Sequence, residues 1–219
     1  MDAGKTFTPA LGHSWLTPLY DLAIAGLTRE KTWRSALVGF VDPQTGERIL
    51  DVGCGTGSLI LQLKIASPQS HIIGVDPDRK VLVKARAKAE SAGHEIEWRE
   101  GFLTREFAAQ LAPVDKVVSS LVFHQTPVEE KRNILGAIWE ALTPGGSLFI
   151  ADYGLQQNAL MRVLFRSTVQ AIDGVEDTTP NAKGLLPYYM RDARFEDIEE
   201  LKVIPTATGS LSIYQGRKP

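Results

Sequence analysis

Short apolar runs alternate along the chain with segments in which apolar residues recur at helical spacing. Apolar runs of roughly four to eight residues between glycines or polar residues are typical of buried strands, and a period of about 3.6 is typical of helices that cover a sheet. Strands are expected near residues 47–52, 71–76, 95–99, 115–120 and 146–152, and helices near 58–66, 78–92 and 128–142. Gly93 and Gly145 are suited to end the last two helices. This alternation predicts an α/β fold, a mostly parallel sheet with helices on both faces.

The C-terminal end follows a different pattern, because two apolar runs succeed each other without a helix between them. Segments 195–203 and 210–217 flank Pro205 and Gly209, which predicts two strands joined by a short connection.

Two helical regions fall outside the alternating core. Residues 11–41 predict two helices broken near Gly26, and residues 153–192 predict further helix interrupted from Gly174 to Lys183. Both are expected over the carboxyl ends of the strands, where ligands bind in open α/β sheets, so they are candidates for a lid. The alternative is that they only cover the edge of the sheet.

Length and composition fit one domain, since 219 residues with 43% hydrophobic content can bury one substantial core. The expected parts are an N-terminal helical lid (1–45), a ligand-binding core (46–153), a helical cap insertion (154–192) and a C-terminal strand pair (193–219).

A glycine-rich loop is the most informative motif. In the segment from Arg48 to Gly57, a buried strand carries Asp51 and ends in three glycines, and a helical segment follows. Glycines lack the β-carbons that would block the approach of a ligand, and the helix N-terminus offers free N–H donors. This pattern predicts a nucleotide-type site.

Two acidic residues indicate which nucleotide. Asp76 ends the next strand about twenty residues beyond the glycines, the spacing expected for a carboxylate that binds ribose hydroxyls. Asp51 stands at the loop entrance, where it would repel a pyrophosphate and suits a cation. S-adenosylmethionine has a ribose diol for Asp76, an ammonium for Asp51 and no phosphate.

With these residues, the chain resembles the class I S-adenosylmethionine-dependent methyltransferases, in the branch that acts on small molecules. The residues that carry the resemblance are, in order, Leu50-Asp-Val-Gly-Cys-Gly-Thr-Gly57, Gly74-Val-Asp-Pro77, Val117-Val-Ser-Ser-Leu-Val-Phe-His124 and Leu142-Thr-Pro-Gly-Gly-Ser-Leu-Phe-Ile-Ala-Asp152. The resemblance spans nearly all of the chain from residue 48 onward. It implies a Rossmann-like seven-stranded sheet whose antiparallel last strand is inserted beside the sixth, with S-adenosylhomocysteine as product.

The residues expected to contact the cofactor are Tyr20, Asp51, Gly53, Cys54, Gly55, Gly57, Asp76, Pro77, Gly101, Phe102, Leu103 and Ser120. Cys54 is expected to act through its backbone N–H, while its side chain is a small buried hydrophobe. Tyr20 matches a tyrosine that relatives place above the cofactor; the alternative is a helix aromatic facing the core. Pro77 suits the adenine face or, alternatively, the first turn of a helix. For Asp76 the alternative is a helix cap.

The adenine side departs from the family pattern. After the third strand, many relatives carry an acidic residue that accepts the adenine amino group, whereas this chain has Gly101-Phe-Leu103. Phe102 cannot accept that bond. It is expected either to abut the purine, with the Leu103 N–H supplying polar recognition, or to belong to the core.

Methyl transfer depends mainly on alignment, because the sulfonium already makes the methyl group electrophilic. His124 follows the fourth strand, where a base would reach a bound acceptor, and it is the candidate catalytic residue; the alternative is a packing role. Further candidates for the acceptor pocket, each also explained by packing, are Asp152, Tyr153, Phe165, Tyr188 and Tyr189. No metal site is expected.

Several acceptor classes are disfavoured. The net charge of −2 and the lack of a basic stripe argue against nucleic acid, and the single Cys54 argues against arsenite. Quinone C-methylating members resemble the first helices and the glycine loop, but their usual residues after the fourth strand are absent. A small, partly apolar acceptor, methylated by in-line substitution, is therefore the expected substrate. The alternatives are a Rossmann-type NAD(P)-dependent oxidoreductase and a non-catalytic cofactor-binding protein.

The cellular setting is expected to be cytoplasmic. No apolar run approaches the roughly eighteen residues that span a bilayer, and the amino terminus precedes no apolar signal core. The sequence does not indicate an oligomeric state.

Overall fold

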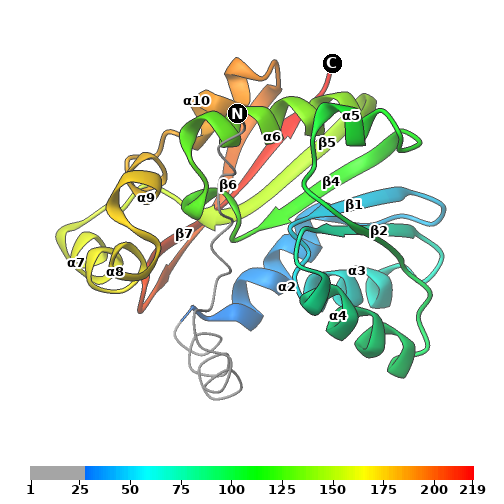
Figure 1. The fold of residues 1–219 in the computed structure, drawn as a ribbon. Helices are drawn as coiled ribbons and strands as arrows, with labels where there is room; N and C mark the ends of the chain where they lie inside the picture. Colours follow the sequence, from blue (N-terminus) through cyan, green and yellow to red (C-terminus); the bar gives the residue numbers. More distant parts are fainter. Residues whose placement is uncertain (1–27) are drawn as a thin grey trace, which may run out of the picture.

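The computed structural model describes residues 28–219, which fold around a seven-stranded sheet in the order β3-β2-β1-β4-β5-β7-β6 (Figure 1). Tyr20 and the first expected N-terminal helix lie outside the described residues. The strands are β1 (Arg48–Val52), β2 (His71–Asp76), β3 (Glu97–Glu100), β4 (Val114–Ser120), β5 (Leu142–Tyr153), β6 (Glu196–Thr206) and β7 (Gly209–Arg217). The helices are α2 (Glu30–Val41), α3 (Ser58–Ala66), α4 (Arg79–Ser91), α5 (Arg105–Ala108), the 3-10 turn η1 (Phe123–Gln125), α6 (Val128–Ala141), α7 (Ala159–Ser167), α8 (Val169–Asp173), α9 (Val175–Ala182) and α10 (Leu186–Asp192).

The sheet is parallel from β3 to β5, and β7 pairs antiparallel with both β5 and β6. This order confirms the expected Rossmann-like sheet with an inserted antiparallel last strand. Pro205 lies in β6, the outermost strand, where a residue without an N–H is tolerated.

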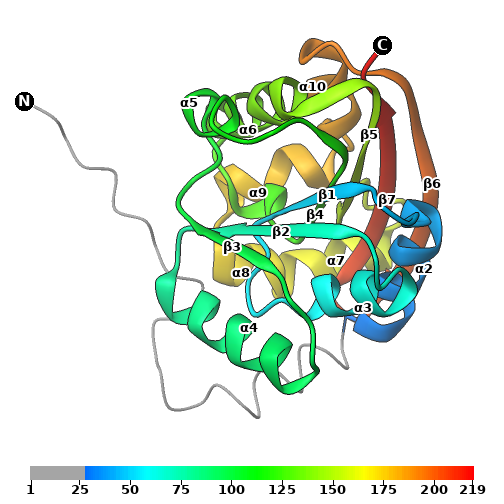
Figure 2. The ribbon, with the colours of Figure 1, turned by 90° about the vertical axis from the view of Figure 1, so that its right-hand side faces the viewer.

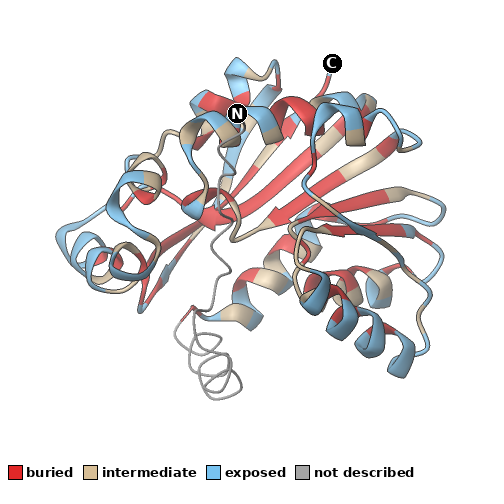
Figure 3. Cartoon of the chain, in the orientation of Figure 1, coloured by how far each residue is buried: buried red, intermediate tan, exposed pale blue. Residues whose placement is uncertain are grey.

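Two apolar layers hold the helices on the sheet, because successive strand residues point to opposite faces. In β1, Ile49 packs with α2, α3 and α4, whereas Leu50 packs with α6 and α10. Phe149 and Ile150 in β5 divide in the same way. Figure 2 shows the two helix layers on either side of the sheet, and Figure 3 shows that the central strands are buried.

Helices α7, α8 and α9 pack on one another and lie beyond the carboxyl ends of β4 and β5 (Figure 1). We refer to residues 155–183, which carry these three helices, as the cap. Helix α10 belongs to the same expected insertion but packs on α6 and β6, on a face of the sheet.

The expected interruption from Gly174 to Lys183 is wrong, because α9 occupies most of that stretch. The hydroxyls of Thr178 and Thr179 donate to the carbonyls of Gly174 and Val175, so these weak helix formers support the turn. Gly174 and Gly184, with φ of 86° and 73°, bracket the helix.

Other differences concern short or irregular elements. Helix α5 and the turn η1 are too brief to produce a periodic signal, and β5 begins at Leu142, before the expected residue 146, with a register shift opposite Val114 and Lys116. No helix in residues 28–219 combines the length and apolarity needed to cross a membrane.

Candidate functional site

The three glycines of the loop have different surroundings. A β-carbon on Gly53 would lie 2.3 Å from Cγ2 of Val122, and one on Gly57 would lie 2.8 Å from the ring of Trp98. At Gly55, by contrast, a β-carbon would meet no atom of residues 28–219 within 4 Å. Gly53 and Gly57 are therefore needed for packing within the protein, whereas Gly55 faces space that the described part of the chain leaves open.

The amides of the loop are mostly occupied. The N–H groups of Gly53 and Cys54 both donate to the carbonyl of Val75, at 2.8 and 3.1 Å, and that of Gly55 donates to Oδ2 of Asp76 at 2.9 Å. The expectation that Cys54 offers its N–H to a ligand is therefore wrong. Its side chain is buried, as expected.

Asp51 lies at the end of β1 and is 1% exposed, and neither carboxyl oxygen has a hydrogen-bond partner among the described residues. Burial raises the pKa of Asp51 to about 7; the guanidinium of Arg34 opposes this rise and the carboxylate of Asp76 adds to it. A buried carboxylate without donors is costly unless a cation or donor reaches it. Asp51 therefore has the property expected of a ligand-binding group.

Asp76, at the end of β2, holds the loop in place. Its Oδ2 accepts from Gly55, and its Oδ1 accepts from the N–H of Asp78 at 2.9 Å. The N-cap of α4 is Asp78, which accepts from Lys80, so Asp76 is not the helix cap and Pro77 precedes the first turn. Each carboxyl oxygen of Asp76 keeps a second lone pair for a ligand.

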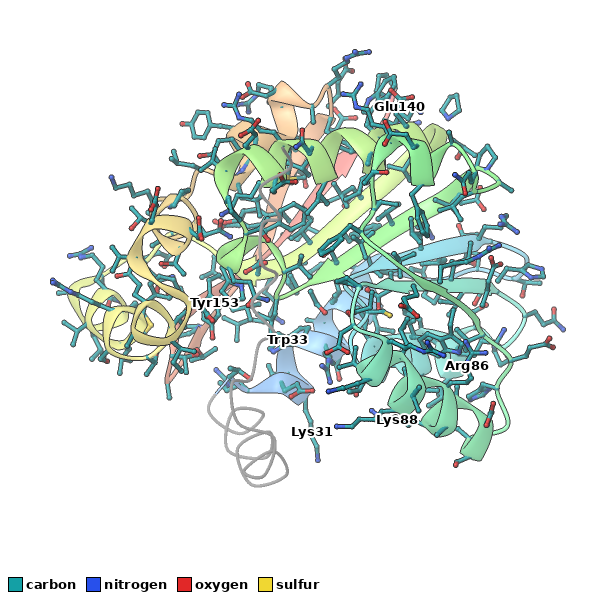
Figure 4. The ribbon with its side chains drawn as sticks, viewed as in Figure 1. Lys31, Trp33, Arg86, Lys88, Glu140 and Tyr153 are labelled. Carbon is teal, nitrogen blue, oxygen red and sulfur yellow. The ribbon has the colours of Figure 1, made fainter. Side chains whose placement is uncertain are left out.

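Two cations near this site were not anticipated from the sequence. Arg34 of α2 pairs with Glu30, and its guanidinium lies close enough to Asp51 to affect the pKa of that carboxyl. Lys88 reaches from α4 to the hydroxyls of Thr56 and Ser58, at 3.1 and 3.0 Å, toward α2 (Figure 4). Arg34 carries no distinguishing signal, because an i,i+4 pair with Glu30 is typical of any solvent-facing helix.

The adenine side is built by the turn after β3. The N–H of Gly101 donates to the backbone carbonyl of Asp76, and Leu103 is buried. Phe102 is 58% exposed, so the alternative of a core position is wrong, and its ring is accessible to a ligand. Ser120 ends β4, adjacent to β1 in the sheet.

His124 lies between two carboxylates. Its Nδ1 is 2.8 Å from Oδ1 of Asp152 at the end of β5, and its Nε2 is 3.4 Å from Oδ2 of Asp173 at the end of α8. Asp152 is fully buried and accepts from the N–H groups of Phe123, His124 and Tyr153. Asp152 is thus fixed by the backbone, while Asp173 makes the longer contact, from the cap.

Burial acts to lower the pKa of His124, but Asp152 and then Asp173 outweigh burial and raise the pKa to about 9. At neutral pH the ring is therefore a cation that joins β5 to the cap. Asp173 gave no signal in the sequence, because only the packing of α8 brings it to His124.

The apolar surroundings of His124 come from the cap. The ring of Tyr153 stands edge-on to His124 with centroids 5.0 Å apart, and Phe165 and Val169 pack against Tyr153. Figure 4 places Tyr153 beside the cap. Tyr189 packs instead with α6 in the core, and Tyr188 is 59% exposed on α10. Of the aromatic candidates, the structure therefore brings only Tyr153 and Phe165 together at this site.

The contrast between two loop glycines gives a testable difference. Gly53→Ala is expected to destabilise the fold by at least about 2 kcal/mol, because a β-carbon would overlap Val122 and φ is 72°. Gly55→Ala has room for its β-carbon, so only its positive φ should reduce stability, by about 1 kcal/mol. Urea unfolding measures the free energy of unfolding of both variants. Equal losses for the two variants would contradict the assignment of Gly53 to packing.

The glycine loop and its flanking strands match a known protein family. A family model described as a methyltransferase domain matches residues 49–146. Two curated demethylmenaquinone methyltransferases cover most of the chain. The one from Deinococcus radiodurans is 28% identical over 91% of this chain and 83% of its own length, and the one from Thermus thermophilus is 29% identical over 92% of each.

Solved structures share the fold. An O-methyltransferase family protein from Burkholderia thailandensis aligns with a TM-score of 0.69 and 18% identity over 91% of this chain, which spans 58% of that protein. Magnesium protoporphyrin IX methyltransferase from Synechocystis, solved with bound S-adenosylhomocysteine, aligns with a TM-score of 0.69 and 16% identity over 96% of this chain and 91% of its own.

The sheet order, the glycine loop between β1 and α3, and the matches over nearly the whole chain agree with one another. Residues 49–146 thus match a methyltransferase domain, and the fold of the chain is that of the class I S-adenosylmethionine-dependent methyltransferases.

Proposed function

We propose that the protein methylates a small, partly apolar acceptor of the quinol type by direct in-line substitution, with His124 as the base. S-adenosylmethionine supplies an electrophilic methyl group on a positively charged sulfur. The protein binds and orients both reactants and accepts the acceptor's hydroxyl proton.

The observation that carries the cofactor assignment is Asp51, a buried carboxylate without a partner in the described chain. The ammonium of S-adenosylmethionine would satisfy this carboxylate, and the space beside Gly55 leaves room for the methionine chain that bears the ammonium. The free lone pairs of Asp76 suit the two ribose hydroxyls. The exposed ring of Phe102 is available to the purine. Arg34, beside Asp51, suits the carboxylate that accompanies the ammonium.

The acceptor class rests on two observations. The relatives that cover nine tenths of the chain are named for demethylmenaquinone, a quinone, and this similarity over the whole chain outweighs the absence of the quinone C-methylating members' usual residues after the fourth strand. The site beside His124 is walled by apolar side chains, since Leu121, Phe165 and Val169 pack around Tyr153. An apolar ring fits against these side chains, and a hydroxyl on that ring would reach the imidazole of His124.

His124 is arranged to remove that hydroxyl proton. Its Nδ1–H donates to Asp152, which leaves Nε2 as the acceptor in the neutral ring. The 3.4 Å contact to Asp173 is long for a hydrogen bond, so an acceptor hydroxyl can replace it. The cofactor loop is close, because Val122 contacts Gly53 only two residues before His124. Proton removal makes the oxygen, or the ring carbon conjugated with it, the nucleophile that displaces the sulfur from the methyl carbon.

The oxidoreductase alternative is disfavoured by the sheet. Dinucleotide-binding Rossmann domains have the order 3-2-1-4-5-6, whereas here an antiparallel strand lies between β5 and β6.

Methylation of a reduced naphthoquinol without a side chain tests the proposal. In the presence of S-adenosylmethionine, mass spectrometry should detect the methylated ring with the quinol and none with the oxidised quinone, which is not a nucleophile. The rate constant kcat/KM should rise with pH and level off near 9, because the free enzyme must first lose the proton on His124. Asp173→Asn should move this rise to lower pH by about one unit or more, since one carboxylate that raises the pKa is lost.

Asp192→Asn is the matched control, because Asp192 pairs with Arg132 on α6, away from His124, at 3.1 Å. If the dependence of kcat/KM on pH is unchanged in Asp173→Asn, His124 does not accept the proton. Tight binding of S-adenosylmethionine with no methylation would favour the non-catalytic alternative.

A further inference from the structure

Exposed aliphatic side chains gather on the cap. Within residues 28–219, ten large hydrophobic side chains are exposed, and five of them lie between residues 155 and 175: Leu155, Leu160, Val163, Ile172 and Val175. Their exposed fractions run from 48% to 63%. Single exposed aliphatics are ordinary on a protein surface, but half of those described fall in a tenth of the described chain. Figure 3 shows the exposed outer turns of α7 and α8 at the end of the molecule.

Basic residues accompany these aliphatics. Arg162 and Arg166 are exposed on α7, one turn apart, and Lys183 is exposed after α9. Two acidic residues of the cap interact instead with side chains of η1 and α6. Asp173 contacts His124, and Asp177 lies beside the buried ammonium of Lys131.

The exposed charges of the cap are thus three cations and one anion, Glu176. An outer face that combines aliphatic and basic side chains complements a membrane surface with anionic headgroups.

The inner face of the same helices lines the acceptor site. Met161 and Phe165 are buried on the opposite side of α7 from Leu160 and Val163, and Phe165 packs on Tyr153 beside His124. The cap therefore presents apolar side chains both to the outside and to the site.

We propose that the outer face of the cap, formed by the five aliphatics with Arg162, Arg166 and Lys183, docks on a membrane that contains anionic lipid, from which the enzyme draws a lipophilic acceptor. The docking itself follows from the surface, whereas the role in acceptor uptake rests on the proposed function. The aliphatic side chains enter the boundary between headgroups and acyl chains, and the cations pair with lipid phosphates.

Flotation of the whole protein with vesicles tests the docking without any acceptor. Vesicles containing phosphatidylglycerol should bind the protein, and pure phosphatidylcholine vesicles should bind it at least tenfold more weakly. The double variant Leu160→Asp/Val163→Asp should lose at least tenfold in vesicle affinity. The double variant Arg162→Gln/Arg166→Gln should lose roughly fivefold in vesicle affinity for each arginine replaced. Added salt should weaken the vesicle binding of the wild-type protein more than that of the glutamine variant.

Ile65→Asp is the matched control, because Ile65 is 68% exposed on α3, outside the cap. It should bind vesicles as the wild type does. Thermal unfolding of each variant verifies the fold, which these exposed positions should leave intact.

Three results would overturn the docking surface. They are no binding to anionic vesicles, an equal loss in Ile65→Asp, and a cap variant that turns an oligomer into a monomer with vesicle binding unchanged. The last result would identify the face as a contact between copies of the chain. Methylation of the tail-free naphthoquinol in solution needs no membrane, so it separates failure of the docking from failure of the proposed function.

Discussion

Replacement of Asp76 by alanine is expected to weaken the binding of S-adenosylmethionine and S-adenosylhomocysteine at least a hundredfold. Two hydroxyls of the ribose would each lose a bond to a carboxylate, worth about 1.5–3 kcal/mol apiece. The variant also loses the contact that fixes the N–H of Gly55, so the loop itself is less constrained. Titration calorimetry with either ligand measures the change.

Asp78→Ala is the control for Asp76→Ala. Asp78 caps α4 through the N–H of Lys80, so its removal should cost about 1 kcal/mol of folding stability and leave the ligand affinity unaltered. Should Asp76→Ala bind S-adenosylhomocysteine like the wild type, the ribose does not lie at Asp76.

Replacement of Asp51 by asparagine is expected to stabilise the ligand-free protein while it weakens cofactor binding. The pKa of Asp51 rises from 3.8 to about 7 on folding, so the folded state holds its proton more tightly than the unfolded state. Stability is therefore unaffected below pH 4, falls as the pH rises from 4 to 7, and is lower by about 4 kcal/mol above that range. Asparagine cannot ionise. Urea unfolding should thus show a gain for Asp51→Asn at pH 8 that disappears near pH 4.

The affinity for the cofactor should follow the opposite course. An ammonium needs the ionised carboxylate, so the wild-type affinity for S-adenosylmethionine should fall up to tenfold for each pH unit below about 7, and binding near pH 7 should release a proton. Asp51→Asn should bind weakly at every pH. Asp42→Asn makes the same change at an exposed site and should alter neither stability nor affinity. Equal affinities of Asp51→Asn and the wild type would exclude Asp51 from the ammonium site.

The sequence predicted the part of the site that depends on local order. The alternation in β1, β2 and β4 predicts parallel strands, and parallel strands bring their carboxyl ends to one edge of the sheet. Asp51, Asp76 and His124 follow strands or end them, so their approximate neighbourhood was determined by the strand pattern alone. The inserted antiparallel strand followed from the family resemblance, carried by four motifs in order.

Only the tertiary structure decided what each of these residues contacts. The different surroundings of Gly53 and Gly55, the engaged N–H of Cys54 and the exposure of Phe102 depend on how distant segments of the chain pack together. Arg34, like Asp173 beside His124, belongs to a helix whose packing on the sheet is not encoded in any local period. The sequence by itself therefore determined the fold and the cofactor loop, since both follow from backbone periodicity and glycine geometry. Packing between remote elements decided the protonation of Asp51 and His124, because desolvation and neighbouring charge set a pKa only once the chain is folded.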